Sequence, residues 1–448
     1  MSDSAVVASN ILASRLKGRV VTPDDNLYQS EKNFPWSQTC WLPAACYVQP
    51  HTSDEVAIAL KCIKEAESQF AIRCGGHNCN VNVSSVDSSG VVIDLRNLNS
   101  LSLDRTSGIA RVGAGCKWEQ VYAFLEEHGL TAIGGRQKDV GVGGFFLGGG
   151  MSAFSNLHGL GADNIVNFEV VLASSIIVNA NKDENSDLCH ALKGGGSNFG
   201  VVTRFDIQTC EIKAQYTLNM YDLADYSNIL RATIEVQEAM ETDPKYGMFV
   251  TFYPTMCFVG LFYADWAEET PKAFKSMKSL VDSLRPATHL RRQVYTASTK
   301  LSYDMYLNIH KHWLGMLEKN PGAGNMFYAI PPVSTNVSQL AEARGGNPMG
   351  IERVPQTWWA FASEWEDEVN DAAGYQGVSE LCSGAQKIAQ EKGQLLNLIF
   401  MNDASTSQNV LASYGADNAR MLQETAAKYD PQGVFQKLQY DGFLIRKM

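Results

Sequence analysis

The sequence predicts an α+β protein of two or three domains. Short strand and helix patterns are mixed over the first 130 residues, residues 134–161 are very rich in glycine, and aromatic strands replace the glycines after about residue 210. The length of 448 residues fits two or three domains. A content of 45% hydrophobic and 19% charged residues is an ordinary globular balance that can bury a sizeable core.

The first domain is expected to alternate helices and short strands. Thr52 is a favourable N-cap and Glu55, three residues later, completes a capping-box pattern, which predicts a helix over 51–68. An amphipathic helix is expected over 118–129, ending at Gly129. The other predicted elements are strands at 69–73, 90–95, 108–115 and 199–209, a hairpin at 164–181 and a helix at 186–196.

The second domain is expected to hold aromatic strands between helical stretches. Two such strand regions fall at 248–266 and 357–365, and near residue 395 the pattern returns to short elements. Strand alternation in the later region places Trp358, Ala360, Ala362 and Glu364 on one face. The predicted boundaries are 1–210 for the first domain, 211–394 for the second and 395–448 for a C-terminal segment.

The charge balance limits the partners. A net charge of −11 and a pI near 5.3 argue against nucleic acid and against anionic membrane surfaces, because both partners require a basic surface. No run approaches the length of a transmembrane helix. The N-terminus lacks the basic start and apolar stretch of a signal peptide, which favours the cytoplasm, whereas sequons at Asn82 and Asn336 point weakly to secretion, so the compartment stays open.

The ten cysteines do not indicate a metal site. None forms a CxxC pair, and most lie in apolar runs that are typical of buried thiols. The sequence leaves the oligomeric state open.

Glycine clusters indicate a long ligand that carries a pyrophosphate. They occur at 75–76, 134–135, 141–144, 148–150 and 194–196. Glycines let backbone N–H groups converge on an anion without a Cβ in the way, although each cluster alone could be a simple turn. A Rossmann site fails on spacing, because "GVGGFF" is not G-x-G-x-x-G, and no P-loop pattern occurs.

Five motifs together carry a resemblance to a known family. In chain order they are "RCGGHN", "GGRQKDVGVGGFFLGGG", "HGLGADNIVNFEVVL", "ALKGGGSNFGVVTRF" and "YGADNARMLQETAAKYDPQGVF". Over about 40–210 and 395–445 the chain resembles the FAD-linked oxidases of the berberine-bridge-enzyme type, in the vanillyl-alcohol-oxidase or PCMH superfamily. The residues of these motifs most resemble the fungal branch of the family, which is found in secondary-metabolite pathways. The resemblance implies a two-part FAD-binding domain, to which the C-terminal segment returns, and a substrate domain with a central antiparallel sheet flanked by helices.

The resemblance also implies how FAD is held. The histidine of the first motif, His77 here, is joined in the family to the 8α-methyl group of the flavin, and the preceding glycines let the ring edge come close. The alternative is a dissociable flavin beside a non-bonded His77. The residues carried over to the cofactor are Arg73, Cys74, Gly75, Gly76, His77, Asn78, Gly135, Gln137, Val140, Gly141, Gly143, Gly144, Gly148, Gly150, Met151, Gly161, Asn164, Ile165, Gly200, Val201 and Asn402.

Two departures concern attachment and oxygen. Gln137 stands where many relatives have a second flavin-bonded cysteine, so we predict a single covalent link, through His77. Val140 stands at a position associated with oxygen access, and its small side chain favours oxidase over dehydrogenase behaviour. The alternative is that Val140 is an ordinary core residue.

Other departures remove the tyrosines that act in relatives. Met151 and Phe400 stand at two of these positions and cannot exchange a proton. Asp403 stands at the third and is the first candidate base, because an apolar flavin pocket would raise the pKa of its carboxyl; otherwise it is a solvated loop acid. Glu364 is the second candidate, and its side chain faces either the pocket or solvent. The weaker candidates are Tyr253, His310 and His312, which are otherwise ordinary core or surface residues.

The predicted function is an FAD-dependent oxidase of a small molecule, with O2 as second substrate. The aromatic strands of the second domain suit a flat, largely apolar ligand, such as a hydroxylated aromatic or polyketide-type natural product, unless they form ordinary core. Hydride would pass to flavin N5, and O2 would reoxidise the flavin to give H2O2. Two other functions stay open: a redox-neutral cyclase or isomerase on the same scaffold, and a non-catalytic metabolite-binding protein.

Overall fold

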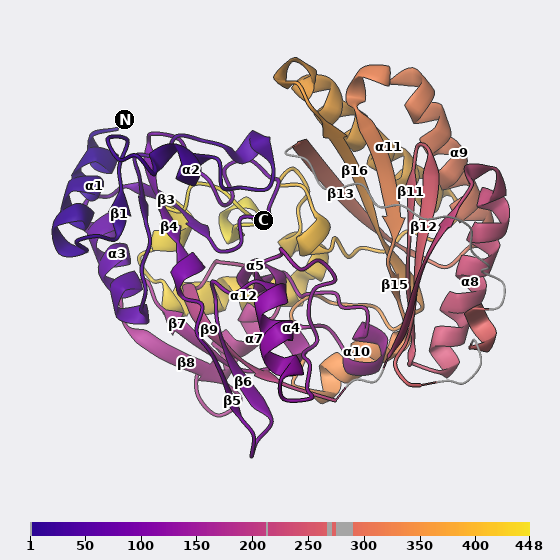
Figure 1. The fold of residues 1–448 in the computed structure, drawn as a ribbon, viewed down its shortest axis with the longest axis horizontal. Coiled ribbons are helices and arrows are strands. Elements are labelled where there is room, and N and C mark those ends of the chain that lie inside the picture. Colours follow the sequence, from indigo (N-terminus) through magenta and orange to yellow (C-terminus); the bar gives the residue numbers. More distant parts are fainter. Residues whose placement is uncertain (1, 212–213, 267–270, 275–289) are drawn as a thin grey trace.

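The structure is a computed structural model that describes residues 2–211, 214–266, 271–274 and 290–448. Figure 1 shows two parts that lie side by side. The first part contains strands β1 to β9 and the second contains β10 to β16, while the C-terminal segment, coloured yellow, runs back into the first part. This arrangement is the α+β architecture that the sequence predicts.

The first part begins with a small sheet in the order β1-β2-β4-β3, in which β2 and β3 run parallel to β4. Helix α3 connects β2 to β3. Thr52 caps α3 by accepting a hydrogen bond from the Glu55 N–H, but the Glu55 carboxylate binds the His51 N–H and Arg19, so the predicted capping box is incomplete. The bounds here are α1 (Asp3–Arg15), β1 (Val20–Val21), α2 (Tyr28–Lys32), β2 (Cys46–Val48), α3 (Ser53–Glu65), β3 (Gln69–Arg73) and β4 (Gly90–Asp94).

The second sheet of the first part is antiparallel, in the order β5-β6-β9-β7-β8. The predicted hairpin is β7 and β8. Helix α5 lies inside the glycine-rich stretch, where the sequence predicted no helix. The bounds are β5 (Leu101–Asp104), β6 (Ile109–Gly113), α4 (Trp118–Glu126), α5 (Val142–Leu147), α6 (Ser155–His158), β7 (Ile165–Val171), β8 (Ile177–Asn181), α7 (Ser186–Leu192) and β9 (Val201–Gln208).

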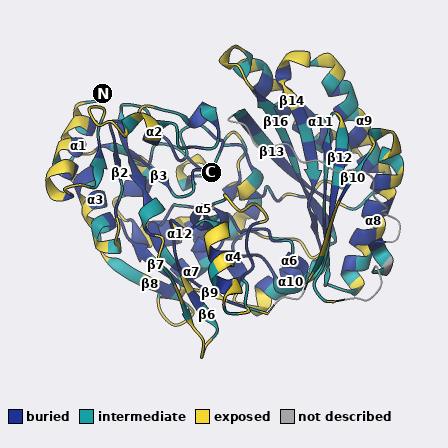
Figure 2. Cartoon of the chain, in the orientation of Figure 1, coloured by how far each residue is buried: buried dark blue, intermediate teal, exposed yellow. Residues whose placement is uncertain are grey.

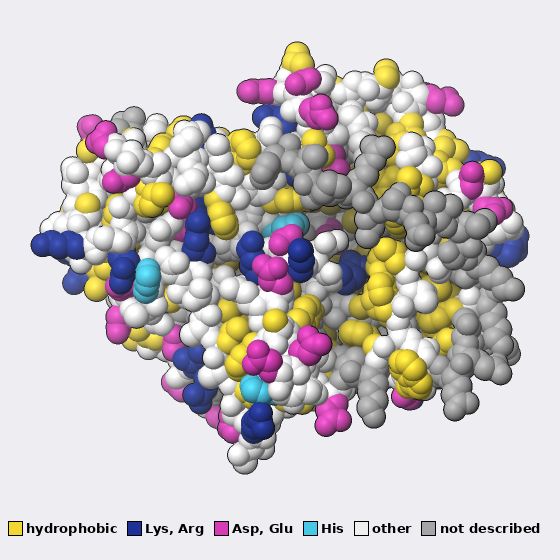
Figure 3. All heavy atoms as spheres, viewed as in Figure 1, with side chains coloured by type: hydrophobic (Ala, Val, Ile, Leu, Met, Phe, Trp, Pro, Cys, Tyr) yellow, Lys and Arg dark blue, Asp and Glu magenta, His cyan; other side chains and the backbone are white. Residues whose placement is uncertain are grey.

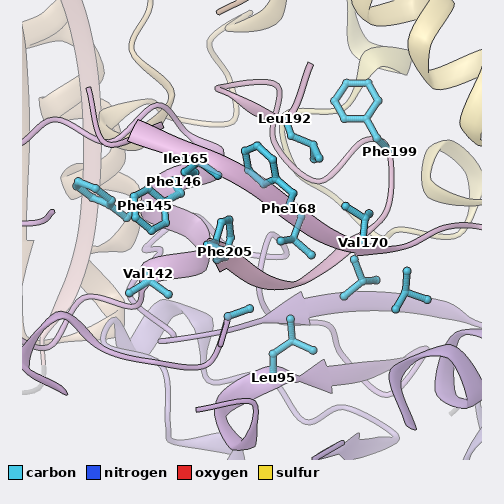
Figure 4. Packing of buried hydrophobic residues seen from close by; sticks show 14 of the residues in the cluster. Leu95, Val142, Phe145, Phe146, Ile165, Phe168, Val170, Leu192, Phe199 and Phe205 are labelled. Atoms are coloured by element: carbon cyan, nitrogen blue, oxygen red, sulfur yellow. The ribbon is translucent and has the colours of Figure 1, made fainter. Parts of the chain in front are cut away.

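Buried aromatic rings fix α5 to the second sheet (Figure 4). Phe146 of α5 lies 5.1 Å from Phe205 of β9, and Phe205 lies 5.7 Å from Phe168 of β7, measured between ring centroids. Trp118 packs edge-on against Phe145 and Phe146. All these rings are buried, and each contributes roughly 2–3 kcal/mol of burial free energy. These ring contacts therefore hold the glycine loop around α5 against the second sheet.

The second part is an antiparallel sheet in the order β10-β12-β11-β14-β16-β13, with β15 paired to β16. Helices α8, α9 and α11 cover one face and bury residues such as Trp359 and Phe361 (Figure 2). The opposite face, which we call the open face, turns toward the first part and carries Ala360, Ala362 and Glu364, so the predicted alternation is confirmed. The bounds are β10 (Gln215–Tyr221), α8 (Tyr226–Thr242), β11 (Tyr246–Tyr253), β12 (Met256–Tyr263), β13 (Arg291–Lys300), α9 (Tyr303–Lys319), β14 (Asn325–Ile330), β15 (Pro332–Val333), α10 (Thr335–Ala343), β16 (Gln356–Trp365) and α11 (Asp371–Glu391).

The C-terminal segment packs on the first part. The Phe70 N–H of β3 donates to the Leu438 carbonyl at 2.9 Å, and the Tyr440 N–H donates to the Phe70 carbonyl at 2.8 Å. Helices α12 (Ala416–Tyr429) and α13 (Val434–Lys437) precede this contact. The boundaries near 210 and 394 stay predictions. Among the described residues, no helix is both long and apolar enough to cross a bilayer.

Candidate cofactor and substrate site

The Gly-Gly-His turn after β3 crosses the glycine loop that precedes α5. A Cβ on Gly75 would lie 2.5 Å from the Gly141 nitrogen, and one on Gly141 would lie 2.6 Å from the Gly75 nitrogen. Gly76 has a φ of +69°, which favours glycine. The place of a Cβ on Gly75 is therefore taken by the Gly141 backbone, which explains this glycine without a ligand. Gly75 and Gly141 allow the two backbone segments to cross this closely, and the crossing determines where the chain places His77.

His77 leaves this turn beside Trp36. The two rings are stacked, with centroids 4.3 Å apart and planes 13° apart. Burial lowers the pKa of His77 to about 4, with further lowering by Arg292 and Lys117 and an opposing effect of Asp139. The imidazole is therefore neutral at neutral pH and keeps the lone pair that a nucleophile needs.

Arg292 of β13 joins Trp36 to the open face. Its guanidinium carbon lies 3.9 Å from the Trp36 ring centroid, and its Nη1 donates to the Trp36 carbonyl at 3.0 Å. Its Nε donates to Glu364 Oε1 at 2.7 Å. Glu364, the second candidate base, is thus an ion-pair partner, and this charge-assisted bond holds Arg292 over the indole.

Asn402 fastens the glycine loop. Its Oδ1 accepts from the Gly150 N–H at 2.9 Å, and its Nδ2 donates to the Gly144 carbonyl at 3.1 Å. A Cβ on Gly148 would lie 2.3 Å from the same Nδ2, whereas a Cβ on Gly144 would have no neighbour within 4 Å. Gly148 is therefore a packing requirement, and Gly144 borders space in which a ligand can approach the backbone.

Asp403 and Arg136 line a hollow between the two parts. Burial raises the pKa of Asp403, and the charge of Arg136 opposes the rise. Asp403 is nevertheless partly accessible and Arg136 is exposed, although enough protein surrounds both to perturb them. Groups that are surrounded yet accessible line a hollow, and Figure 3 shows the surface hollowed between the parts, with charged side chains of both signs gathered near its middle.

The open face forms an aromatic wall beside this hollow. Tyr253 stacks on Phe327, with ring centroids 4.6 Å apart, and Phe258 packs edge-on against Tyr253. Burial raises the pKa of Tyr253, Glu364 adds to the rise and Arg292 opposes it. Because the same face carries the small side chains of Ala360 and Ala362, it suits a flat and largely apolar ligand.

Two polar residues carried over to the cofactor have structural partners. The buried guanidinium of Arg73 binds Asp94, with Nη2 to Oδ2 at 2.6 Å, and Glu31 at 3.2 Å. The Asn164 amide donates to two backbone carbonyls and accepts from Arg344 at 2.7 Å. Both side chains stabilise the loops around the site.

The other carried-over residues surround the same loops. Close packing explains several glycines: Gly135 lies against Trp118, Gly143 against the Cys74 thiol, Gly150 and Gly161 against Phe145, and Gly200 against Val170. Met151, Ile165 and Val201 are buried, Val140 is partly buried, Gln137 is exposed, and Asn78 accepts from the Asn80 N–H. Their contacts with FAD stay predictions.

His310 and His312 lie away from the hollow. His310 is buried under the helix-covered face, where its Nδ1 lies 2.8 Å from the Tyr328 hydroxyl and its ring stacks on Tyr226. Burial lowers its pKa to about 4. His312, also on α9, packs against Gly384 of α11. Neither side chain lies on the open face.

Two further observations bound the chemistry. A cavity of about 300 Å³ lies in the C-terminal segment, lined by residues 406–411, 442–444 and Lys447, and no predicted site residue lines it. Over the described ranges, no three His, Cys, Asp or Glu side chains come together as metal ligands.

The residues present fit FAD. Gly144 leaves backbone open for close approach, and His77 supplies a neutral nucleophile at the end of a rigid turn. Sequence reasoning missed Trp36, Arg292 and Arg136. Arg136 stands inside a quoted glycine motif, whereas Trp36 and Arg292 carry no local signal, because their contact depends on how β13 meets the first part.

Solved structures show the same fold. The chain superposes on 6-hydroxy-D-nicotine oxidase from Arthrobacter nicotinovorans with a TM-score of 0.79 at 19% identity, covering 96% of this chain and 98% of that one. It superposes on the berberine bridge enzyme from Eschscholzia californica with a TM-score of 0.76 at 15% identity, covering 97% and 99%. The fold is therefore that of the FAD-binding proteins of the berberine-bridge-enzyme type.

Sequence comparison identifies the family. The family described as "FAD binding domain" matches residues 44–181. The FAD-dependent monooxygenase yanF of Aspergillus niger is 31% identical, covering 98% of this chain and 79% of the relative. The bifunctional solanapyrone synthase of Alternaria solani is 30% identical, covering 98% and 89%. The chain belongs to the family of FAD-binding oxidoreductases that contains these fungal enzymes, and it is an enzyme of that class.

Proposed function

We propose that the protein is an FAD-dependent oxidase whose flavin is held by a single covalent bond from His77. The observation that carries this proposal is the neutral imidazole of His77, stacked on Trp36 at the end of the Gly-Gly turn. A fixed ring with a free lone pair suits bond formation to the 8α-methyl carbon; the methyl C–H and the imidazole N–H would give up their protons, and the electron pair would pass to the flavin ring and on to O2. Gln137 offers no second attachment, because an amide lacks the nucleophilicity of a thiolate.

In this proposal, the side chains around the hollow accept a proton from the substrate and orient it beside the flavin. When bound at these loops, FAD would supply a two-electron acceptor for a hydride from the substrate, with O2 as the final oxidant, reduced to H2O2. Asp403 accepts the proton released by the substrate hydroxyl. The open face, with Tyr253 and the Arg292–Glu364 pair at one corner, orients a flat hydroxylated aromatic or polyketide-type substrate. The name of the solanapyrone synthase relative supports a natural-product substrate.

Two specific observations support other reactions. The names of several relatives favour a monooxygenase, in which one oxygen atom enters the product. Met151 and Phe400 cannot exchange protons, which favours a redox-neutral cyclase or isomerase in which fewer protons move.

Oxygen balance during turnover tests the proposal. An oxidase releases one H2O2 for each O2 consumed, and anaerobic substrate bleaches the flavin absorbance. Isotopic oxygen from labelled O2 in the product would instead establish a monooxygenase, and turnover with no O2 uptake would establish a cyclase. Binding of the compound without product formation would leave a metabolite-binding protein.

A further inference from the structure

Arg136 is an exposed cation near the place where the two parts meet. It follows Gly135 in the loop before α5, and its guanidinium carbon lies 5.4 Å from the ring centroid of Phe249 on β11. Over the described residues, the guanidinium makes no hydrogen bond or ion pair at contact distance. Its electrostatic partners at longer range are Asp403 and the hydroxyl of Tyr216.

The surroundings of Arg136 are aromatic. Tyr216 of β10 stacks on Phe262 with centroids 4.7 Å apart, and Phe249 lies 5.9 Å from Phe262. Gly260 leaves room for the Phe249 ring, since a Cβ there would lie 2.2 Å from it. Partial desolvation by the surrounding protein lowers the pKa of Arg136, and Asp403 and Tyr216 oppose the fall. An accessible guanidinium with unused donors beside aromatic rings favours an anionic oxygen as ligand.

Asp403 limits which anionic oxygen fits. A substrate carboxylate would bring a second permanent negative charge near the Asp403 carboxylate. Repulsion between two carboxylates that share one cation disfavours such a substrate. An acidic hydroxyl avoids this conflict. When its O–H bond breaks, the proton passes to Asp403, which becomes neutral, and the negative charge stays on the substrate oxygen.

We propose that Arg136 recognises an enol or phenol hydroxyl of the substrate as its oxyanion, with Asp403 as the proton acceptor and Phe249 beside the ring. This proposal rests on the proposed function, because it places the substrate in the hollow between the two parts. It adds a specificity-determining residue and narrows the substrate class to flat molecules with an acidic hydroxyl.

Three small probes that differ in one group test the proposal on the flavin-loaded protein. These are 4-nitrophenol, 4-nitrobenzoate and 4-nitroanisole, with affinities measured by calorimetry and ionisation of bound 4-nitrophenol followed by difference absorbance. The groups that face Arg136 and titrate are Asp403 and Tyr216. We expect 4-nitrophenol to bind most tightly and to ionise at lower pH when bound than in water.

Variants of one loop assign the effect. Arg136→Gln should weaken the binding of 4-nitrophenol roughly tenfold and leave the binding of 4-nitroanisole unchanged. It should also remove the shift in the pH at which bound 4-nitrophenol ionises. Arg136→Lys, which keeps the charge, should retain part of the shift. Lys138→Gln removes an exposed charge from the same loop and should change neither quantity. If Arg136→Gln loses its flavin, binding of the three probes to the wild type and to Arg136→Lys still tests whether Arg136 recognises the oxyanion.

The contrary outcomes are distinct. Equal binding of 4-nitrophenol and 4-nitroanisole, no binding of 4-nitrophenol, or an unchanged Arg136→Gln variant would each overturn the proposal. Tighter binding of 4-nitrobenzoate would assign Arg136 to carboxylates instead. A purified protein that takes up no FAD would count against the proposed function, whereas a flavin-loaded protein with indifferent probe binding would contradict only the role of Arg136.

Discussion

The indole of Trp36 stacks on the imidazole of His77, with ring centroids 4.3 Å apart and planes 13° apart. Arg292 lies over the same indole at 3.9 Å and is held by Glu364. A histidine, an indole and a guanidinium thus form one connected stack that joins the turn of the first part to the sheet of the second. The stack positions His77 and keeps a positive charge close to it.

Arg292→Gln should raise the pKa of His77 above its value of about 4, because it removes a nearby positive charge. Attachment of flavin requires the neutral imidazole, so the pH below which attachment fails should move upward. The measurement is the fraction of covalent flavin after apoprotein is incubated with FAD over a pH series. Arg291→Gln, whose side chain binds Asp371 instead, is the matched control. An identical pH midpoint in the two variants would refute this effect.

Asp403→Asn should lower kcat by about a hundredfold or more while FAD content is kept, because an amide cannot accept the substrate proton. Burial raises the pKa of Asp403, so wild-type activity should fall as pH drops through a value above the usual 3.8. That acidic limb should be missing in the variant. Asp417→Asn, at an exposed helix position, should behave as wild type. Equal kcat in Asp403→Asn and wild type would remove Asp403 as the base.

Two glycine substitutions separate folding from cofactor binding. Gly75→Ala should prevent correct folding, because its Cβ would lie 2.5 Å from the backbone of Gly141. Gly144→Ala should fold, since its Cβ meets no protein atom, but should bind FAD more weakly if the cofactor approaches this backbone. Circular dichroism and flavin content measure the two effects. Normal FAD binding by a folded Gly144→Ala protein would contradict this placement of the cofactor.

His310 should make the second part sensitive to acid. Its folded pKa is about 4 and its unfolded pKa about 6.5, so the unfolded state binds more protons between these values and stability falls as pH falls. From pH 6.5 to pH 5 the loss should be about 1.6 kcal/mol. Urea unfolding of His310→Gln, which does not titrate, should show a loss smaller by that amount. An equal loss of unfolding free energy in the variant and the wild type over this pH range would contradict the role of His310.

Local patterns predicted several elements of the first part and the aromatic strands of the second. Alternation in 357–365 predicted which residues of β16 share a face, because side chains of a strand repeat every two residues, but it did not predict which face the helices cover. The hairpin of β7 and β8 followed from its two apolar runs. Helix α5 was missed, because glycine has low helix propensity and the packing of Phe145 and Phe146 on Trp118 outweighs it.

The candidate site was predictable only where a motif marks it. His77 stands in a quoted motif and Asn402 between two positions compared with relatives, 400 and 403, and the structure places both at the glycine loops. The reason for Gly75 was not predictable, since it depends on the crossing with Gly141. The pairing of Arg292 with Glu364 depends on the register of β13 and β16, which no local pattern shows.

Acid precipitation of the purified protein tests the central claim most directly. If His77 is bonded to the flavin, the yellow colour should stay with the precipitated polypeptide, and a His77→Ala protein should release its colour into the supernatant. A yellow supernatant from the wild-type protein would show that FAD is bound without a covalent link and would contradict the account.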